Sequence, residues 1–298
     1  MAKRFPKVLA LCGVLFFGVQ AQGAESRPLA GLSYSPSNVR TEAEFAVAPP
    51  LDKLKADLAP LAALTPRVRT YSMAPGVDQV VPIARDLGLK VSVGIWLQTD
   101  PAVDADEISR GIMAVLKTPT AVDRVFVGNE VLTSKFQSAV ALKARMADVK
   151  AALTEGGVKE IQVSTAETWN MWLAHPELAP DADFIGAHIF PYWDGVPVAD
   201  AVPYVLRRYK ELQAAFPGKK IVIAETGWPA AGPQYKGAIP SPENQERFVR
   251  EFARAAAGLD YYICEAYNQP WKAAREGGAV GASWGILDAG GKPKFLLR

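Results

Sequence analysis

The amino-acid sequence predicts an α/β protein with a single (β/α)₈ domain, the TIM-barrel class. The first observation is alternation, because eight short β-branched or apolar runs are separated by segments with helical spacing. The second is length, since residues 25–298 have the size expected of one such barrel. The third is that acidic and aromatic residues gather just after the apolar runs, where these barrels carry function. A doubly wound open sheet is the structural alternative, because alternation alone does not close a barrel.

The expected strands follow one another without a low-complexity linker that would divide the chain. They cover residues 29–35, 67–71, 90–96, 123–130, 161–167, 183–190, 220–228 and 261–269. Apolar residues at intervals of three and four predict amphipathic helices between the strands. These residues are Leu51, Leu54, Leu58 and Leu61; Leu142, Met146, Val149 and Leu153; and Val202, Val205, Tyr209, Leu212 and Phe216. Another helix is expected from Ser241, an N-cap residue that is followed by Pro242 and Glu243.

Residues 1–24 have the pattern of a secretory signal peptide. Three basic residues, Lys3, Arg4 and Lys7, precede an apolar stretch over 8–19, and a zone with small residues follows it. The apolar stretch is too short for a membrane anchor, which needs about 20 apolar residues. We therefore expect an exported chain without a membrane anchor, whose folded domain covers residues 25–298.

The charge of the chain argues against nucleic-acid binding. The formal net charge is +2, but loss of the three basic residues of the signal peptide leaves 30 Lys and Arg against 31 Asp and Glu. A nearly neutral chain without a polybasic run lacks the electrostatic footprint of a nucleic-acid-binding protein.

After cleavage of the signal peptide only Cys264 remains, so no intrachain disulfide is expected. The strand-like surroundings of Cys264 predict a buried apolar side chain.

Several common catalytic motifs are missing from the sequence. It contains no CxxC pair, no HExxH, no glycine-rich phosphate loop and only two histidines, so no metal or cofactor is expected. Residues 281–285 match the G-x-S-x-G pattern of serine hydrolases, in which an Asp and a His follow the serine. Here both histidines, His175 and His188, precede Ser283, which argues against a nucleophilic serine.

Two glutamates stand at the ends of apolar runs. Glu130 ends Val-Phe-Val-Gly-Asn-Glu, and Glu225 ends Ile-Val-Ile-Ala-Glu. A buried strand end is a costly place for an unpaired carboxylate, so the pair needs an explanation. Two carboxyl groups facing a glycosidic bond can divide the work, one attacking and one donating a proton. The structural alternative is that each glutamate is ion-paired, with Arg69 or Lys272.

The tryptophans support a carbohydrate ligand. All seven follow the ends of expected strands and none is expected in a helical segment: Trp96, Trp169, Trp172, Trp193, Trp228, Trp271 and Trp284. Indole faces can stack against the apolar faces of sugar rings, while their N–H groups bind hydroxyls. The alternative is that two or three of them only close the mouth of the barrel.

At these residues a resemblance becomes specific. The segments Gly128-Asn129-Glu130 and Glu225-Thr226-Gly227-Trp228-Pro229 resemble the two signature strands of glycoside hydrolase family 17, the β-1,3-glucanase family of the retaining clan A barrels. Further matches lie along nearly all of residues 25–298. They are Gly31-Leu32-Ser33-Tyr34, Arg69-Thr70-Tyr71, His188-Ile189-Phe190-Pro191-Tyr192-Trp193 and Asn268-Gln269-Pro270-Trp271-Lys272. The last two segments favour a bacterial branch of the family.

The resemblance implies roles for particular residues. Glu225 would be the nucleophile that forms a covalent glucosyl–enzyme intermediate, and Glu130 the acid/base. Asn129 would bind the 2-hydroxyl of the reacting sugar. The other expected substrate contacts are Tyr34, Arg69, Tyr71, Glu167, His188, Tyr192, Trp193, Trp228, Gln269, Trp271, Lys272 and Trp284. Two residues depart from the plant endoglucanases, which tend to have Tyr in place of Phe190 and Glu in place of Gln269, so their long open cleft is not assumed here.

The expected function is therefore a retaining glycosidase acting on β-1,3-glucan by double displacement. A β-1,3-glucanosyltransferase that uses the same two glutamates is the enzymatic alternative, and a non-catalytic glucan-binding barrel is the alternative from another class. The expected partner is a β-glucan oligosaccharide or polysaccharide. We expect a monomer that needs no cofactor and that is periplasmic or secreted in a bacterium.

Overall fold

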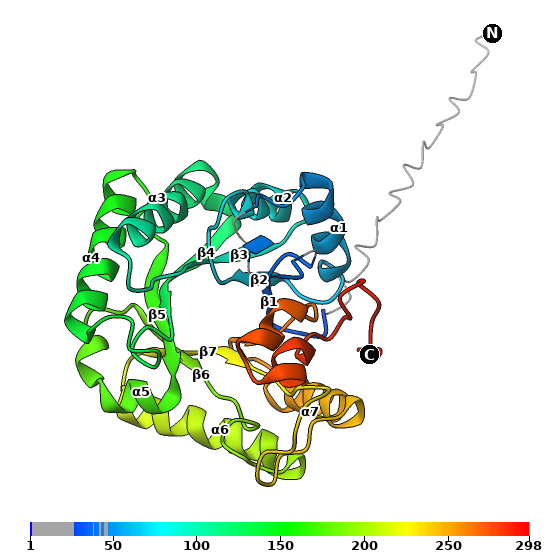
Figure 1. The fold of residues 1–298 in the computed structure, drawn as a ribbon. Coiled ribbons are helices and arrows are strands. Elements are labelled where there is room, and N and C mark those ends of the chain that lie inside the picture. The colour runs from blue at the N-terminus through cyan, green and yellow to red at the C-terminus, as the bar shows by residue number, and fades with distance from the viewer. Residues whose placement is uncertain (2–26, 38, 42, 45–46, 298) are drawn as a thin grey trace.

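A computed structural model describes residues 1, 27–37, 39–41, 43–44 and 47–297 of the chain. Apart from Met1, the expected signal peptide lies outside these residues. Eight strands form the centre of the domain, with helices around them (Figure 1). None of the helices in the described ranges is long and apolar enough to cross a membrane.

The eight strands form a closed parallel barrel in chain order. They are β1 (Leu32–Tyr34), β2 (Arg67–Thr70), β3 (Lys90–Ile95), β4 (Val122–Asn129), β5 (Gln162–Thr168), β6 (Phe184–His188), β7 (Lys220–Thr226) and β8 (Tyr261–Ile263). Pairing of Leu32 in β1 with Ile263 in β8 closes the barrel. The predicted (β/α)₈ class is confirmed over the doubly wound alternative, and every predicted strand is present.

An α-helix follows each of the first seven strands. The helices are α1 (Leu51–Leu61), α2 (Val80–Asp86), α3 (Pro101–Lys117), α4 (Ala139–Glu155), α5 (Trp169–Ala174), α6 (Val198–Ala215) and α7 (Pro242–Ala255). Short 3₁₀ segments lie between them: η2 (Val77–Gln79), η3 (Pro119–Ala121) and η4 (Pro176–Leu178). Ser241 caps α7 as predicted, since its hydroxyl accepts a hydrogen bond from the Asn244 amide at 3.1 Å.

The last βα unit departs from the expectation. The predicted strand over 261–269 is too long, because β8 ends at Ile263 and the chain then turns to pair Tyr267 with Leu287. Between β8 and residue 297, the 3₁₀ segments η5 (Pro270–Ala274) and η6 (Gly278–Ser283) take the place of an eighth α-helix. Pro270 opens η5, and the glycines around η6 have low helix propensity, which explains the short elements.

Two apolar clusters build the core. The smaller one fills the barrel and consists of Phe126, Ala166, Phe184, Val222, Ala224 and Tyr262. The larger one lies between the strands and the surrounding helices. The inner cluster requires a glycine at position 186, where a Cβ atom would lie 2.6 Å from the Thr165 carbonyl oxygen and 2.8 Å from the Phe126 ring.

An ion network lies at the amino-terminal end of the barrel. Asp260, just before β8, accepts from Arg67 and Arg124 at 2.7 Å each and lies 2.6 Å from Lys220 Nζ. Arg124 is buried and also lies over the rings of Phe184 and Tyr262. Burial opposes ionisation of Asp260, but Arg124 and Arg67 outweigh it and hold the pKa of this carboxyl below its ordinary value.

We predict that Asp260→Ala lowers the free energy of unfolding by about 3–5 kcal/mol, because it leaves the buried Arg124 without its closest carboxylate. Asp86→Ala, which breaks the exposed ion pair with Arg85, should cost no more than about 1 kcal/mol. Urea denaturation of both variants measures the difference. Since the folded-state pKa of Asp260 is depressed, its contribution should be present at neutral pH and fade as the pH falls into the acidic range. Equal stability of the two variants at pH 7 would contradict the role of the network.

Candidate active site

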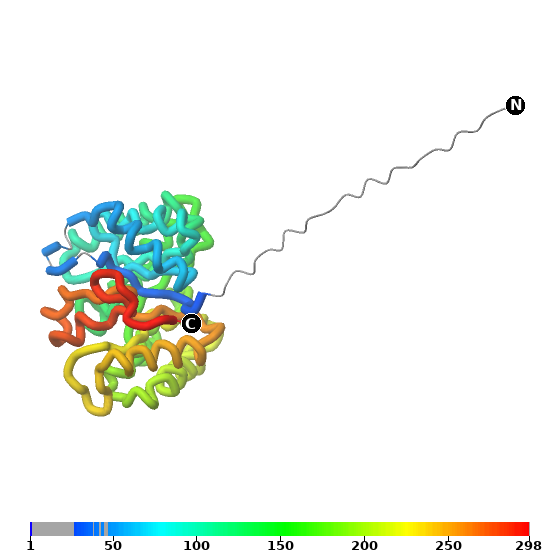
Figure 2. Tube along the Cα trace, turned by 90° about the vertical axis from the view of Figure 1, so that its right-hand side faces the viewer, coloured from blue at the N-terminus to red at the C-terminus, as the bar shows by residue number. Residues whose placement is uncertain are grey.

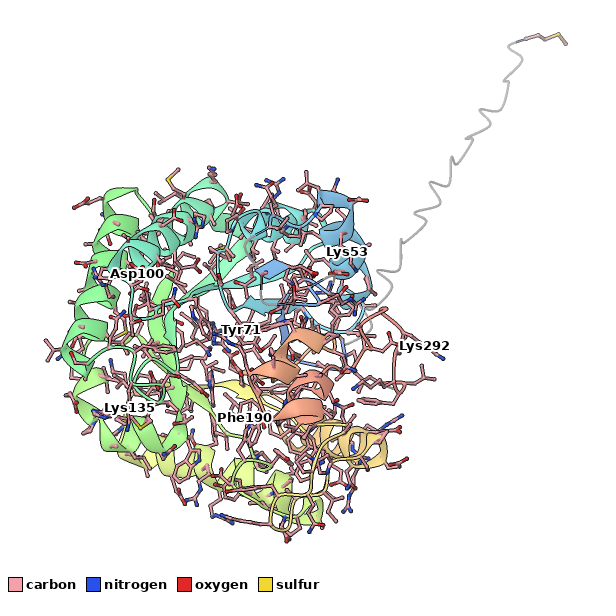
Figure 3. The ribbon with its side chains drawn as sticks, in the orientation of Figure 1. Lys53, Tyr71, Asp100, Lys135, Phe190 and Lys292 are labelled. Atoms are coloured by element: carbon pink, nitrogen blue, oxygen red, sulfur yellow. The ribbon has the colours of Figure 1, made fainter. Side chains whose placement is uncertain are left out.

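The carboxyl ends of the strands carry the residues that the sequence singled out. The loop after β7 (yellow) and the segment after β8 (orange) project from the same side of the molecule, at the left of Figure 2. Tyr71, which follows β2, and Phe190, which follows β6, lie over the middle of the ring of elements in Figure 3. Lys53, Asp100 and Lys135 lie around its rim.

Glu130 directly follows β4 in an unusual backbone conformation. Its φ is 53°, in the left-handed region that residues other than glycine rarely adopt. The pairing of β4 with β5 shifts register just before it, and Gly128 has a φ of 86°. The Glu130 amide donates to the Ala166 carbonyl at 2.7 Å, which holds the turn in place. This geometry brings Oε1 of Glu130 to 2.7 Å from His188 Nδ1, with 31% of the side chain exposed.

Glu225 lies in β7 in a much more enclosed setting, with 8% of its side chain exposed. Arg69, fully buried on β2, donates through Nη1 to Oε1 of Glu225 and to the Ala224 carbonyl. Burial alone would raise the pKa of Glu225, but the charges of His188 and Arg69 outweigh burial and hold that pKa below its ordinary value. Glu225 is therefore ionised at neutral pH.

His188, the last residue of β6, lies between the two carboxylates. Its Nδ1 is hydrogen-bonded to Glu130, and its Nε2 lies 3.2 Å from Oε1 of Glu225 without the alignment of a hydrogen bond. One buried imidazole therefore contacts both acidic groups. The carboxylate on one side is enclosed and held by a guanidinium, and the one on the other side is partly open to solvent. The two carboxylates therefore differ in burial and in the side chains that hold them.

Asn129 and Arg69 are fixed by one another. The Nη2 group of Arg69 donates to Oδ1 of Asn129 at 2.6 Å. Because a guanidinium can only donate, the amide oxygen faces Arg69, and the NH₂ group of Asn129 is the one available to a ligand. Arg69 therefore links the Glu225 carboxylate on β7 to the amide at the end of β4.

Lys272 is paired with a third glutamate that the sequence analysis did not single out. Its Nζ lies 3.0 and 3.1 Å from the two carboxylate oxygens of Glu265, and both side chains are buried. Burial raises the pKa of Glu265 to about 7, against the opposing effect of Lys272. Tyr71 lies between two cations, with Arg69 5.3 Å and Lys272 5.2 Å from its ring centroid. Lys272 pairs with Glu265 and not with Glu130 or Glu225, so that part of the structural alternative is wrong. The other part is correct for one glutamate, because Arg69 pairs with Glu225.

Glu276 is a further acidic residue near the site that sequence reasoning missed. Burial raises its pKa, and the charges of Glu225 and Glu130 act in the same direction. Neither Glu265 nor Glu276 lies in the sequence segments around Glu130 and Glu225 from which the site was predicted. The sequence signal that could have revealed Glu265 is an acidic residue inside the apolar run after Tyr261.

Besides Arg69, His188, Lys272 and Trp284, five expected substrate contacts are buried, and protein groups bind their polar atoms. Tyr34 donates to Asp57 at 3.1 Å, Tyr192 to the Pro233 carbonyl at 2.9 Å and Trp228 to the Ile239 carbonyl at 3.1 Å. The Gln269 amide donates to the Ser35 carbonyl and accepts from Trp271. Glu167 accepts from the amides of Leu132 and Thr133 and so anchors the loop after Glu130. None of these five side chains is exposed. Glu167 and Gln269 instead hold Thr133, which is exposed, and Trp271, which is partly exposed.

Aromatic residues after β6 and near the carboxyl terminus form a chain of ring contacts that begins at His188. Phe190 contacts His188 and Trp284, with ring centroids 6.3 and 5.1 Å apart, and Trp193 lies 6.1 Å from Trp284. Trp284 is buried, whereas 44% of Trp193 is exposed. Since Phe190 has no hydroxyl group, Arg69 and His188 are the side chains that orient Glu225.

Two expectations about single residues can now be assessed. The expectation that no tryptophan lies in a helical segment is wrong, because Trp169 and Trp172 lie in α5 and Trp271 lies in η5. Trp172 is buried and donates to the Gly186 carbonyl at 2.7 Å, so it packs a helix against the barrel. Cys264 is buried as expected, and burial raises the pKa of its thiol.

Other chemistries find no support in the described ranges. Ser283 ends the 3₁₀ segment η6 and donates to the Ala279 carbonyl, so the strand–turn–helix setting of a nucleophilic serine is missing. Among the residues that the structure describes, no group of three or more His, Cys, Asp or Glu side chains could hold a metal ion.

Curated proteins with similar sequences are named as glucosidases. The chain is 29% identical to the probable β-glucosidase btgE of Aspergillus clavatus, over 74% of this chain and 39% of that protein. It is 28% identical to the probable family 17 glucosidase SCW10 of Saccharomyces cerevisiae, over 87% of this chain and 64% of that protein. The chain thus spans less than two thirds of the length of these curated relatives.

Solved structures show the same barrel. The crystal structure of a glycoside hydrolase family 17 β-1,3-glucanosyltransferase from Rhizomucor miehei has a TM-score of 0.78 at 25% identity, covering 91% of this chain and 98% of that one. An endo-laminarinase from Formosa has a TM-score of 0.76 at 20% identity, covering 89% and 84%, and supports the fold alone. The BtgE/BtgC glycoside hydrolase domain matches residues 31–285, so the chain belongs to that family and, as its sequence predicted, to glycoside hydrolase family 17.

Proposed function

We propose that this protein is a retaining glycosidase that cleaves β-1,3-glucan by double displacement. The observation that carries the proposal is the unequal pair of carboxylates on either side of His188: Glu225 buried and ionised, Glu130 partly exposed. Retention is general to the family, and two carboxyl groups are the equipment that it needs. A glucan-binding barrel without catalysis would have no use for this difference between the two glutamates.

The proposed reaction has two steps. In the first, Glu225 attacks the anomeric carbon, the bond from that carbon to the leaving sugar oxygen breaks, and Glu130 gives its proton to that oxygen. In the second, Glu130 takes a proton from water while the water oxygen attacks the anomeric carbon and releases Glu225. Arg69 and His188 stabilise the carboxylate that is expelled, and the NH₂ group of Asn129, whose oxygen accepts from Arg69, binds the 2-hydroxyl of the sugar.

The substrate class follows from the site and from its relatives. A neutral polysaccharide offers no charge, so binding must come from stacking and hydrogen bonds. The Phe190 ring contacts His188, which lies between the two carboxylates, and Trp193 is connected to Phe190 through Trp284. A probable glucan endo-1,3-β-glucosidase from Aspergillus clavatus, btgC, is 25% identical over 90% of this chain, which supports β-1,3-linked glucose as the substrate.

Transfer to a sugar is the second candidate. It uses the same glucosyl–enzyme intermediate, which a sugar hydroxyl rather than water then attacks. The similarity to the Rhizomucor miehei β-1,3-glucanosyltransferase over nearly all of both chains favours it.

We also propose that the protein is exported, on the strength of the signal-peptide pattern in residues 1–24. The periplasm or the surroundings of a bacterial cell is the proposed location, and the bacterial branch of the family stays a prediction from the sequence. A monomer is proposed as the working form.

We predict that Glu225→Ala and Glu130→Ala both lose cleavage of laminari-oligosaccharides, Glu225→Ala by at least about 10³-fold and Glu130→Ala by about 10²–10⁴-fold. Azide should distinguish the two roles when an aryl β-laminaribioside is the substrate. In Glu225→Ala, azide attacks the anomeric carbon from the vacated face and gives an α-glycosyl azide. In Glu130→Ala, azide attacks the glycosyl–enzyme and gives a β-glycosyl azide.

The control for these variants is Glu211→Gln, on the surface of α6, which should keep the activity of the unmodified protein. Cleavage that survives Glu225→Ala, or azide products of the opposite configuration, would overturn the assigned roles.

We predict that Arg69→Met shifts the acid limb of the kcat/KM profile to higher pH. Removal of the guanidinium removes a charge that holds the pKa of Glu225 down, so the nucleophile becomes protonated at a pH where it is normally ionised. Arg69→Lys, which keeps the charge, should shift the limb less. Arg85→Met, at an exposed ion pair, serves as the control, and circular dichroism checks folding. An unchanged acid limb in folded Arg69→Met would refute the electrostatic role.

The balance of hydrolysis and transfer is tested by the products formed from a single laminari-oligosaccharide. We expect shorter products to dominate at low substrate concentration, because water is always present. If products longer than the substrate appear and increase with its concentration, a sugar hydroxyl competes with water and the protein is a glucanosyltransferase.

A further inference from the structure

A series of aromatic contacts leads from the catalytic centre to the surface. His188 contacts Phe190, Phe190 contacts Trp284, and Trp284 contacts both Trp193 and Tyr192. Tyr192 in turn lies 4.8 Å from Trp193 and 6.3 Å from Tyr235, measured between ring centroids. Tyr235 belongs to the loop between β7 and α7 and ends the series, so the rings that follow β6 and β7 form one connected group.

The loop that carries Tyr235 is fixed to the loop after β6. The Gly237 amide donates to the Gly195 carbonyl at 3.1 Å, and the Tyr192 hydroxyl donates to the Pro233 carbonyl at 2.9 Å. Tyr235 and Ala238 pair with each other in a short antiparallel bridge. Figure 2 shows this segment in yellow, at the end of the molecule where the catalytic residues lie. Tyr235 is therefore held in a defined position.

Exposure separates the rings into two kinds. Tyr192 and Trp284 are buried and act as support, whereas 44% of Trp193 and 40% of Tyr235 are open to solvent. Two exposed aromatic rings supported by the same buried Tyr192 offer apolar faces on which a ligand can stack. The Nζ of Lys236 lies 5.1 Å from the Tyr235 ring centroid and is a hydrogen-bond donor beside that ring.

We propose that Tyr235, with Trp193, forms an outlying sugar-binding subsite for a β-glucan chain, separate from the subsite at Glu130 and Glu225. The inference rests on the proposed function, because it extends that same site. The occupant is a neutral glucan because the exposed rings continue the aromatic contacts of the catalytic centre, and sugar rings present apolar faces for stacking. The ring centroids of Tyr235 and Trp193 lie within 11.1 Å of each other, since both contact Tyr192.

Such a subsite acts only on substrates long enough to reach it. Tyr235→Ala should raise KM for laminarihexaose about three- to tenfold, the effect of losing one aromatic stacking partner, and leave kcat unchanged. The same variant should leave kcat/KM for laminaritriose unchanged. Tyr235→Phe keeps the stacking face and should bind laminarihexaose like the unmodified protein.

Ile239→Ala is the matched control, because Ile239 is an exposed apolar residue of the same loop but has no aromatic face. It should leave both substrates unaffected. The inference is overturned if Tyr235→Ala matches the unmodified protein on laminarihexaose, if it impairs the triose and the hexaose equally, or if Ile239→Ala gives the same loss.

Direct binding separates this inference from the proposed function. Calorimetry measures the affinity of laminarihexaose for Glu225→Ala and for the double variant Glu225→Ala/Tyr235→Ala. If the unmodified protein cleaves no β-1,3-glucan but Tyr235→Ala still weakens hexaose binding, the subsite stands and the proposed chemistry fails. If the protein cleaves β-1,3-glucan and binding does not depend on Tyr235, the subsite fails alone. Absence of both cleavage and binding overturns both.

Discussion

The ion pair between Arg69 and Glu225 is the interaction on which the site depends. An unpaired carboxylate buried at a strand end would either take up a proton or destabilise the fold, and neither outcome suits the nucleophile proposed for this position. Arg69 prevents them with bonds to Glu225, to the Ala224 carbonyl and to Asn129. Its guanidinium also lies 4.5 Å from the Phe126 ring centroid, which joins it to the cluster inside the barrel. Arg69 therefore connects the packing of the interior to the charge of Glu225, which His188 also helps to maintain.

The two ends of the barrel use charge differently. At the amino-terminal end, Asp260 pairs with Arg67, Arg124 and Lys220, and Asp123 lies near both arginines. At the carboxyl end, His188 contacts two acidic groups, and one of them, Glu130, remains partly exposed. The first arrangement stabilises the fold, and the second leaves a group that can meet a ligand. This division agrees with the general placement of stability and function in barrels of this class.

The repeating parts of the molecule could be predicted from the sequence, and the contacts between distant segments could not. Alternation located all eight strands, and apolar runs ending in acid located Glu130 and Glu225, because each signal lies within a few neighbouring residues. The pairing of Lys272 with Glu265 and the burial of Trp172 depend on how separate segments pack, and no local pattern encodes them. The end of β8 at Ile263 was missed for a related reason, since the segment after it pairs with residues near the carboxyl terminus.

The backbone at Glu130 carries a consequence for how this protein could change over time. A left-handed conformation costs a glutamate about 1–3 kcal/mol but costs glycine almost nothing. Position 130 is therefore a place where selection for activity opposes selection for stability. A descendant released from catalysis would become more stable by acquiring glycine there, while its barrel and its aromatic surface stayed intact. Under the proposed function, this single mutation would remove the acid/base and leave a barrel that still binds glucan.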